Sequence, residues 1–494
     1  MSEELELKFL VQDVAAAQAW LGHRLGATDS SSDSGSWRTV QITDRYFDTA
    51  DGALAAAGFG ARLRRLGRRN LVTVKSDLEV VGGLHRREEL EAPATRALDP
   101  RAWPESEARS RVIEVCGSRR LIERFRVKQE RHELAASVAG AVVLASLDQA
   151  SVFVAGRAAG TLQQLEVELR SGDEAALRTL GEEIGAAGIG QPESRSKMVI
   201  AAGLAEAAAV VLPSDPMAAA GRVVLRKQLL RMLEREPAAR AGEVLAIKQM
   251  RVATRRMRAA WRSFGDAYKK AARRMYVAEL RRVARALGEV RDMDVLLEGV
   301  PTDAALVPLA QAWQARRSEA HARVVALLED AAYDEFVGDY LDFIGDGDAA
   351  VARTAPAQTV AEAAPARLAE SADRMRAAGE AALAGGDAVA WHALRISARR
   401  LRYTVESLRV ALDERAAAEA IARLVRVQDA LGAMNDATVA AREADAWLVA
   451  NPAAPPATVS AVTAYAARQR DALARVRQSL EPVWRAASEV FTQR

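Results

Sequence analysis

The feature that most constrains the fold is a charged alternation at the start of the chain, Glu4-Leu5-Glu6-Leu7-Lys8. Successive side chains of a β-strand point to opposite faces, so Glu4, Glu6 and Lys8 share one face of the predicted strand. Two carboxylates about 7 Å apart on one strand suit a hard divalent cation such as Mg²⁺ or Mn²⁺. A solvated edge strand would carry the same five residues, so this motif alone does not decide the function.

Comparable alternations recur along the first 170 residues and carry charges of both signs. The residues that share a strand face in these segments are Arg62 and Arg64; Thr73 and Lys75; Arg87, Glu89 and Glu91; Arg126 and Lys128; and Glu166 and Glu168. Turned outward, these faces would make a solvated sheet, whereas turned inward they would line a barrel with acids and bases. A charged interior is tolerated only where the charges pair or hold ligands. A metal ion bound to the acids and a phosphate bound to the bases would neutralise both sets of charges.

These motifs, together with Arg45-Tyr46-Phe47-Asp48-Thr49 and Ser196-Lys197, resemble in content and order the CYTH family, the triphosphate tunnel metalloenzymes. The resemblance covers residues 2 to 203 and implies an eight-stranded antiparallel β tunnel that binds a triphosphate with Mg²⁺ or Mn²⁺. The implied triphosphate ligands are Lys8, Arg62, Arg64, Lys75, Arg87, Arg126, Lys128 and Lys197. The implied metal ligands are Glu4, Glu6, Glu166, Glu168 and Asp148. Lys8 would orient or activate the attacking water, as a catalytic residue beside Glu4 and Glu6. Glu89 and Glu91 could hold metal or fix the basic residues by pairing.

The pattern of turns and apolar residues predicts the remaining elements of this part. We expect helices at 14–25 and 173–187, and a hairpin of strands 61–66 and 71–76 around Gly67. A further helix is expected over 94–115, broken by Pro100 and Pro104. An alanine run followed by Pro213 and Pro216 suggests a linker at 205–217, between a first domain at 2–204 and a second at 218–490.

The second part has no convincing strand and consists of two related segments. Lys248–Arg258 matches His392–Arg402 at an offset of 144 residues (392 − 248), and Leu287–Asp292 matches Leu431–Asp436 at the same offset. One register held over two motifs predicts two repeated four-helix bundles, at about 218–345 and 360–490. The overall fold class is therefore α+β, a β tunnel followed by an all-α domain.

Each copy of the repeat carries a narrow basic stripe on one predicted helix. At 100° per residue, Lys248, Arg251, Arg255 and Arg258 fall within about 80° of one another. The corresponding stripe of the second copy is His392, Arg395, Arg399 and Arg402. Like charges this close repel unless anions neutralise them, and arginine binds phosphate oxygens with two donors at once. A solvated face with glutamate partners is the alternative, but the stripes themselves contain no acid.

These two segments resemble the CHAD family, the conserved-histidine α-helical domain, over residues 217 to 490. The resemblance implies polyphosphate binding by both stripes. The first copy departs from the family because Lys248 stands where a histidine is usual. Lysine keeps the positive charge, so anion binding should survive, whereas a role that needs a neutral imidazole would survive only at His392.

The leading hypothesis is a metal-dependent inorganic triphosphatase with a polyphosphate-binding helical domain. The alternatives are a non-enzymatic polyphosphate binder directed to polyphosphate granules, a thiamine triphosphatase, and an adenylyl cyclase-like enzyme. Nucleic acid is a weaker partner because the basic segments have few aromatic residues for stacking on bases. The single cysteine, Cys116, excludes an intrachain disulfide, and with no apolar run of membrane length we expect a cytoplasmic protein with no membrane contact. Polyphosphate binding would associate it with granules.

Overall fold

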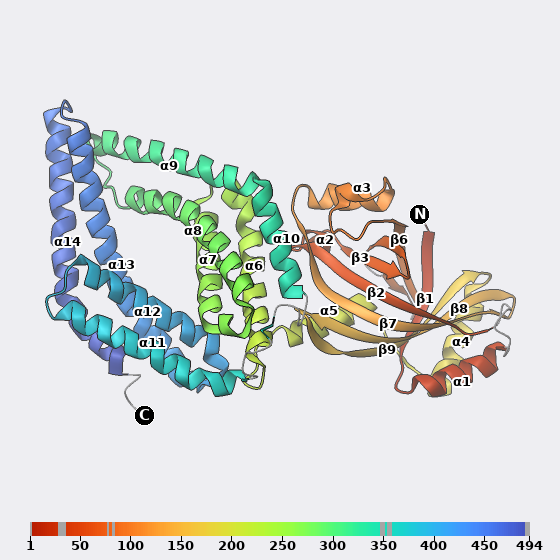
Figure 1. Cartoon of the computed structure of the whole chain (residues 1–494). Coiled ribbons are helices and arrows are strands. Elements are labelled where there is room, and N and C mark those ends of the chain that lie inside the picture. Colours follow the sequence, from red (N-terminus) through yellow and green to blue (C-terminus); the bar gives the residue numbers. More distant parts are fainter. Residues whose placement is uncertain are drawn as a thin grey trace. The chain divides into compact units, whose positions relative to one another are not determined.

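The structure is a computed structural model of the 494-residue chain. It describes residues 2–27, 36–76, 79–81, 84–345, 351–352 and 358–489, with only the backbone of residues 2–4, 79–81, 84–87 and 489. The chain divides into two compact units, Met1–Val210 and Val211–Arg494. The first is built on a β-sheet and the second is helical (Figure 1), so the predicted α+β fold class is confirmed.

The first unit is one antiparallel sheet whose hydrogen-bonded order returns to its first strand. The order is β10-β1-β9-β8-β7-β2-β3-β4-β6-β5, and β1 also pairs with β6. The ten strands are β1 (Ser2–Leu10), β2 (Arg38–Thr49), β3 (Phe59–Leu66), β4 (Arg69–Ser76), β5 (Glu79–Val81), β6 (Leu84–Pro93), β7 (Leu121–Val138), β8 (Ala141–Val154), β9 (Arg157–Ser171) and β10 (Gln191–Pro192). The antiparallel sheet is as predicted, but it has ten described strands rather than eight, with the short β10 and β5 at the two ends of the order.

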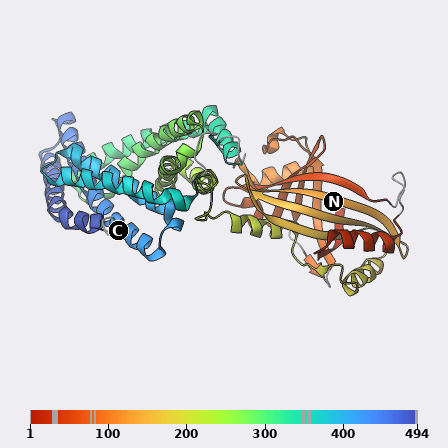
Figure 2. The same ribbon diagram turned by 60° about the horizontal axis from the view of Figure 1, so that its bottom comes forward.

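The outer face of this sheet is apolar and is covered by helices. Leu7 and Phe9 of β1 and Leu147 of β8 share a buried cluster with α1 (Val14–Leu25) and α4 (Glu174–Ala186). Leu63 and Val74 share another with the short α2 (Ala53–Ala56) and with α3 (Glu107–Cys116). Figure 2 shows α1 and α4 lying against the curved sheet. Because neighbouring positions alternate, covering this face with helices turns the charged positions inward.

One end of the inner face is apolar and is closed by α5 (Lys197–Ala208). Phe125 and Val127 of β7 and Val152 of β8 pack there against Ala201 and Ala205 of this helix. The same packing places Lys197, the first residue of α5, at the boundary between the apolar and the charged parts of the interior. The interior is therefore filled with apolar side chains at one end and forms a polar cavity beyond them.

Two predictions of local structure need correction. The helix expected over 94–115 is instead an irregular segment with a 3₁₀ turn at Pro100–Ala102, followed by α3 from Glu107, because Ser106 caps that helix by accepting from the Arg109 amide. The predicted linker begins too early, since α5 continues to Ala208. The helix predicted from Asp173 is confirmed, with the Asp173 side chain accepting from the Ala175 amide.

The second unit repeats four helices at the predicted offset. Its helices are α6 (Met217–Arg240), α7 (Val244–Phe264), α8 (Lys270–Glu298), α9 (Val307–Glu329), α10 (Ala331–Gly345), α11 (Val360–Leu383), α12 (Ala388–Leu408), α13 (Glu414–Ala450) and α14 (Pro456–Glu489). Adding 144 to both ends of α7 gives both ends of α12 (244 + 144 = 388 and 264 + 144 = 408). A 3₁₀ turn follows each of these two helices at the same offset, Gly265–Ala267 and Arg409–Ala411. Among the described residues, only the first copy has a fifth helix, α10.

The two copies meet where α7 packs against α12. Met250, Met257 and Trp261 of α7 are buried, as are Leu394 and Leu401 of α12. Their apolar faces thus lie in the core and leave the arginine positions toward the other side. Trp261 lies in an aromatic cluster with Tyr268, Tyr276, Tyr340 and Phe343 and donates to the Tyr340 hydroxyl at 2.8 Å.

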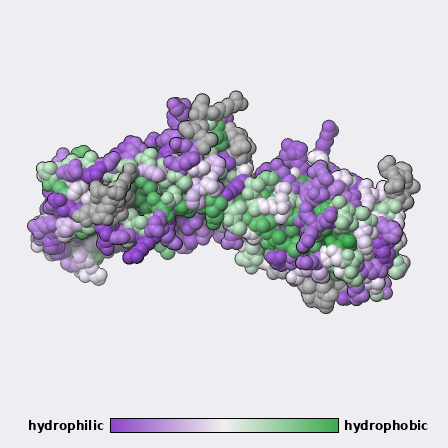
Figure 3. All heavy atoms as spheres, turned by 90° about the horizontal axis from the view of Figure 1, so that it is seen from below, coloured by the Kyte–Doolittle hydropathy of each residue, from purple (hydrophilic) through white to green (hydrophobic). Residues whose placement is uncertain are grey.

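Hydrophilic residues cover much of both units on the face drawn in Figure 3, interrupted by smaller apolar areas. Among the described residues, every helix is too short or too polar to cross a membrane.

Candidate functional site

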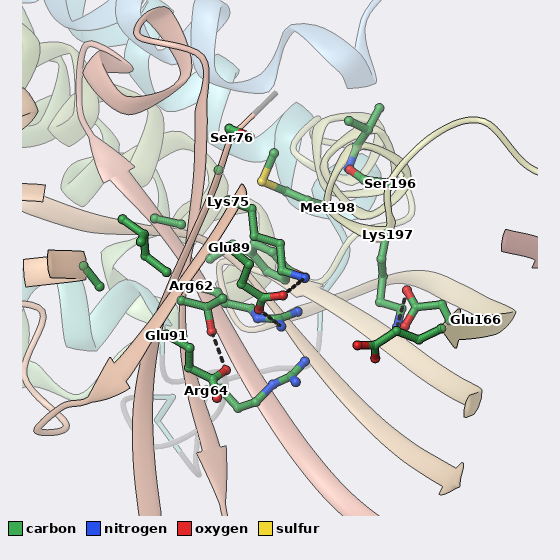
Figure 4. A pocket seen from close by; sticks show the side chains of 18 of the residues that line it. Arg62, Arg64, Lys75, Ser76, Glu89, Glu91, Glu166, Ser196, Lys197 and Met198 are labelled. Atoms are coloured by element: carbon green, nitrogen blue, oxygen red, sulfur yellow. Dashed lines mark hydrogen bonds and ion pairs between the residues drawn. The ribbon is translucent and has the colours of Figure 1, made fainter. Parts of the chain in front are cut away.

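A cavity of about 1440 Å³ lies on the inner face of the first unit. Its walls come from β3, β4, β6, β7 and β9 and from the start of α5. In Figure 4, the side chains from β3, β4 and β6 stand on one side of the cavity, opposite Lys197 and Glu166. The sequence-predicted residues that line it are Arg62, Arg64, Thr73, Lys75, Glu89, Glu91, Glu166, Glu168 and Lys197. The inward orientation is therefore correct for these positions.

Asp44 of β2 anchors the basic wall of the cavity, and the sequence analysis missed it. Its two oxygens accept from Arg64 Nε and Nη2, both at 2.8 Å, and Arg62 Nη1 lies 3.5 Å from Oδ2. Asp44 is fully buried, which would raise its pKa, but the charges of Arg64 and Arg62 outweigh burial and hold the pKa below the ordinary aspartate range. Asp44 lies directly across from Arg64 in the β2–β3 pair, a register that the sequence pattern does not reveal.

Lys75 and Glu89 form the next pair along this wall, with 2.8 Å between Lys75 Nζ and Glu89 Oε2. Glu89 Oε1 also lies 3.9 Å from Arg62 Nη2. Glu91 accepts from the Thr73 hydroxyl at 3.1 Å. Glu89 thus serves as a partner for basic residues, which is one of the two roles left open for it.

The opposite wall holds a second group, Arg131 and Lys197 with Asp148 and Glu166. Arg131 donates to Asp148 at 2.8 and 2.7 Å and to Glu166 at 2.7 Å. Lys197 contacts Asp148 and lies 3.5 Å from Glu166 Oε1. Burial would raise the pKa of Glu166, but Lys197 and Arg131, followed by Lys8 and Lys75, hold it well below its ordinary value. Asp148 and Glu166 were predicted as metal ligands, and here they position two cations.

Glu6 and Lys8 complete the interior from β1. Lys8 Nζ lies 2.7 Å from Glu6 Oε1, and both side chains are buried. In the β1–β9 register Glu6 is directly opposite Glu168, and Lys8 is opposite Glu166. Facing residues of an antiparallel pair have Cβ atoms about 5 Å apart, so Glu6 and Glu168 present two carboxylates to one region.

The carboxylates of Glu6 and Glu168 suit a hard divalent cation, although the described residues do not form a complete set of metal ligands. Oxygen ligands from Glu6 and Glu168 are the type that Mg²⁺ and Mn²⁺ prefer. No set of three acidic, histidine or cysteine side chains lies close enough to hold a metal among the residues described. Glu4, the third predicted carboxylate, and Arg87 pair with each other through their backbones, and their side chains lie outside the described residues.

Several buried polar atoms of the interior have no hydrogen-bond partner among the described residues. They are Arg62 Nε and both amide atoms of Gln129 and of Gln164. A buried polar group without a partner costs roughly 1–3 kcal/mol. These atoms therefore favour a site that is completed by a polar ligand or by water. Gln129 and Gln164 were not predicted, because an uncharged amide leaves no charge pattern in the sequence.

The predicted placement of Arg126 and Lys128 is wrong. They alternate with Phe125 and Val127, which pack inside against α5, so they lie on the outer face of β7. Arg126 pairs there with Glu123 at 2.9 Å, and Lys128 is exposed over the Phe153 ring. The inward arginine of β7 is Arg131.

In the second unit the stripes of α7 and α12 come together. The pKa of Arg251 is lowered by burial and then by Arg255, with Arg395 contributing, so charges of both copies act on one another. Burial, then Arg255 and Arg395, lower the pKa of Arg399 to about 10. We call Arg251, Arg255, Arg395 and Arg399 the seam arginines. None of them forms an ion pair within 4.0 Å with a described residue, and Nε of Arg255 and of Arg395 is buried without a partner.

The other stripe residues differ from the seam arginines. Lys248 and His392 are exposed at the starts of the stripes. Arg402 lies 3.5 Å from Glu406, one turn further along α12, so an acid does follow the second stripe. Burial and Arg281 lower the pKa of Arg258. Asp292 and Asp436 occupy equivalent positions in the two copies. The charges of both carboxylates raise the pKa of Arg395, which burial lowers.

The two units define a class of protein in which a charged β tunnel precedes a duplicated helical domain. Family models agree with this division: the CYTH domain matches residues 2–199 and the CHAD domain residues 223–445. The chain is therefore a CYTH–CHAD protein.

Solved structures resemble each part. The CHAD domain from the plant Ricinus communis is 20% identical, covering 58% of this chain and 95% of its own, with a TM-score of 0.46. PptA from Streptomyces chartreusis is 20% identical over 55% of this chain and 100% of its own, with a TM-score of 0.45. HpAC1 from Hippeastrum, described as having a dominant triphosphatase activity, is 20% identical over 40% of this chain and 94% of its own, with a TM-score of 0.31.

Acid should destabilise the first unit through Asp44 and Glu166. Their folded pKa values are depressed, so their stabilisation is complete above the unfolded values of about 4 and is lost as pH falls toward the folded ones. We expect the free energy of unfolding to be flat from pH 7 to about 5 and to fall below about pH 4. Asp44→Asn should cost ~3–5 kcal/mol at pH 7, since it strands buried Arg64, and should weaken the pH dependence.

Urea unfolding, monitored by hydrogen–deuterium exchange of the β2 and β3 peptides, measures this pH dependence of the free energy of unfolding. Glu182→Gln on the exposed side of α4 is the control and should keep the wild-type pH dependence. Parallel loss of stability in wild type and Asp44→Asn between pH 5 and 3 would contradict the assignment.

Proposed function

We propose that the first unit is a divalent-metal-dependent triphosphatase acting on inorganic triphosphate. One observation carries the proposal: the cavity holds cations and carboxylates that are already paired with one another. Phosphoryl transfer needs mainly positioning and charge neutralisation. A triphosphate could take over the cations while a metal takes over carboxylates, so that neither set of charges is left alone.

The phosphate-binding groups in this proposal are the inward cations Arg62, Arg64, Lys75, Arg131 and Lys197. They stand on two facing walls, so they can hold a linear triphosphate from both sides (Figure 4). Asp44 and Asp148 keep the arginines Arg64 and Arg131 extended and ready, which lowers the entropy lost on binding.

Glu6 and Glu168, with Glu4 from the same strand as Glu6, would hold the metal. A bound Mg²⁺ or Mn²⁺ would supply charge neutralisation at the phosphoanhydride oxygens. Lys8 is the candidate for orienting the attacking water, because its buried ammonium pairs with Glu6 and has three donors, so others remain for a water. The low pKa of Glu166 keeps that carboxylate ionised as the partner of Lys197 and Arg131.

The direct test is phosphate release from inorganic triphosphate, ATP and thiamine triphosphate, each with Mg²⁺, with Mn²⁺ and with chelator. We expect inorganic triphosphate to be the best substrate, chelator to abolish turnover, and Glu6→Gln to reduce kcat by ~10²-fold or more. Manganese binding without substrate, followed by electron paramagnetic resonance, should also weaken in Glu6→Gln. Turnover that resists chelator would contradict the proposal, and tight triphosphate binding without release would favour the non-enzymatic binder.

The inner and outer faces of the sheet offer a matched pair of lysines. Lys75→Ala removes an inward cation and should lower kcat/KM for triphosphate by ~10- to 100-fold, the range of a charge-assisted hydrogen bond. Lys128→Ala makes the same chemical change on the outer face and should leave kcat/KM within about twofold. Steady-state kinetics with melting temperatures decide the matter. Equal kinetics for both variants would remove Lys75 from the phosphate site.

We propose that the second unit binds inorganic polyphosphate along the seam arginines. These four half-buried cations form no ion pair with a described acid, so an anion would relieve their mutual repulsion. A flexible polyanion can contact both helices at once, and the second contact is then effectively intramolecular.

Affinity for long-chain polyphosphate should rise with chain length and fall with salt. Glutamine at Arg251 and Arg255 should weaken binding by ~10-fold or more, and glutamine at all four seam arginines by ~100-fold or more. The control removes the same charge from four exposed, ion-paired arginines outside the seam: Arg323, Arg442, Arg470 and Arg485. Titration of the full chain at two salt concentrations measures this. Equal weakening by the control set, or preference for duplex DNA, would contradict seam binding.

A further inference from the structure

A second, smaller cavity of about 90 Å³ lies between α7, α11 and α12 of the helical unit. Its lining holds four arginines against a single glutamate, together with four hydroxyl side chains. The residues are Arg262, Ser263, Arg367, Glu370, Ser371, Arg374, Ser397, Arg400 and Thr404. The glutamate is already engaged, since Glu370 accepts from Arg374 at 2.6 Å.

The repeat reveals what is unusual about two of these arginines. On the other side of the α7–α12 contact, Arg256 and Glu406 form an ion pair at 3.4 Å. Moving each residue to its counterpart in the other copy gives Arg400 (256 + 144) and Arg262 (406 − 144). The position equivalent to an Arg–Glu pair is therefore an Arg–Arg pair.

Arg262 and Arg400 have no hydrogen bond or ion pair to another described side chain. Both side chains remain accessible to solvent. Partial burial, then Arg400 and Arg258, lower the pKa of Arg262 to about 10. Of the neighbouring cations, Arg367 and Arg273 share Asp266, at 3.5 and 2.6 Å. The acid that lines the cavity, Glu370, is paired with Arg374, so among the described residues no acid pairs with Arg262 or Arg400.

Two further lining residues are polar only on this side. Ser397 and Thr404 stand where the other copy has the buried alanines Ala253 and Ala260 (397 − 144 and 404 − 144), and their hydroxyls donate to the carbonyls of Leu394 and Arg400 in their own helix. The hydroxyls of Ser263 and Ser371 form no hydrogen bond with the described residues, so they are available as donors beside the guanidinium groups.

We propose that this cavity is a binding site for a single tetrahedral oxyanion of the phosphate type, held between Arg262 and Arg400. The volume is about three times that of a water molecule in the liquid, ~30 Å³, which is room for one phosphate group. Arginine forks bind such oxygens with two donors each. The site is separate from the tunnel and from the four seam arginines, and its occupancy does not depend on hydrolysis. The oxyanion is either free orthophosphate or one phosphate group of a polyphosphate.

Equilibrium dialysis of the full chain with radiolabelled orthophosphate at low ionic strength tests the site. Arg262→Glu rebuilds the Arg–Glu pair seen in the other copy, so it should fold stably and bind one orthophosphate fewer per chain than wild type. Arg262→Gln should weaken that same site by ~10-fold. Arg468→Glu on α14 makes an identical charge change on the surface of the same unit and should bind as wild type does.

A parallel titration with linear polyphosphate separates the two sources. If orthophosphate binding is equal in wild type and Arg262→Glu, but polyphosphate binds Arg262→Glu at least ~10-fold more weakly than Arg468→Glu, the site takes a phosphate group of the chain. If neither ligand distinguishes Arg262→Glu from Arg468→Glu, the proposal is overturned. Neither readout needs turnover, so an inactive tunnel would leave this test unaffected.

Discussion

The first unit depends on the pairing of charges that its own strands force inward. Helices cover apolar outer positions such as Leu7, Leu63 and Leu147. Because neighbouring positions of a strand point to opposite faces, the acids and bases between them point inward. Buried charges are tolerated only when paired, and the pairs Asp44–Arg64 and Asp148–Arg131 meet this demand with two hydrogen bonds each. The same pairs hold the cations in place around an open cavity, so fold stability and ligand binding rest on one set of contacts.

The sequence predicted this interior well wherever one strand face was apolar and the other was charged along the whole strand. Arg62 and Arg64, Lys75 and Glu89 obey the alternation, and their inward direction followed from it. The prediction from alternation failed on β7, because the inner face of that strand changes from charged to apolar beneath α5. Apolar Phe125 and Val127 then looked like the outer face, and Arg126 and Lys128 like the inner one. Only the packing of a helix far along the chain decides which face is which.

Asp44 and Arg131 escaped prediction for a related reason. Asp44 is a single charge on its strand face, so it produces no repeated pattern. Arg131 does share its face with Glu133, which also lines the cavity, but the Arg126–Lys128 doublet earlier on β7 was taken for the inner face instead. What makes them important is the partner across the sheet or across the cavity, Arg64 for Asp44 and Glu166 for Arg131. In the helical unit the predicted offset of 144 residues relates both ends of α7 to those of α12, yet the repeat could not show that the two stripes face each other across a seam.

The two units treat cations in opposite ways, and this difference has a consequence for what each can bind. In the tunnel most of the inward cations already have carboxylate partners, so an anion alone must break ion pairs and leave acids unpaired in a buried site. An anion that arrives with a divalent cation avoids that cost, because the metal takes the released carboxylates. At the seam and at Arg262 and Arg400 no acid needs to be released, so an anion alone suffices. The tunnel is therefore built to select a metal–phosphate combination, whereas the helical unit selects for phosphate charge itself.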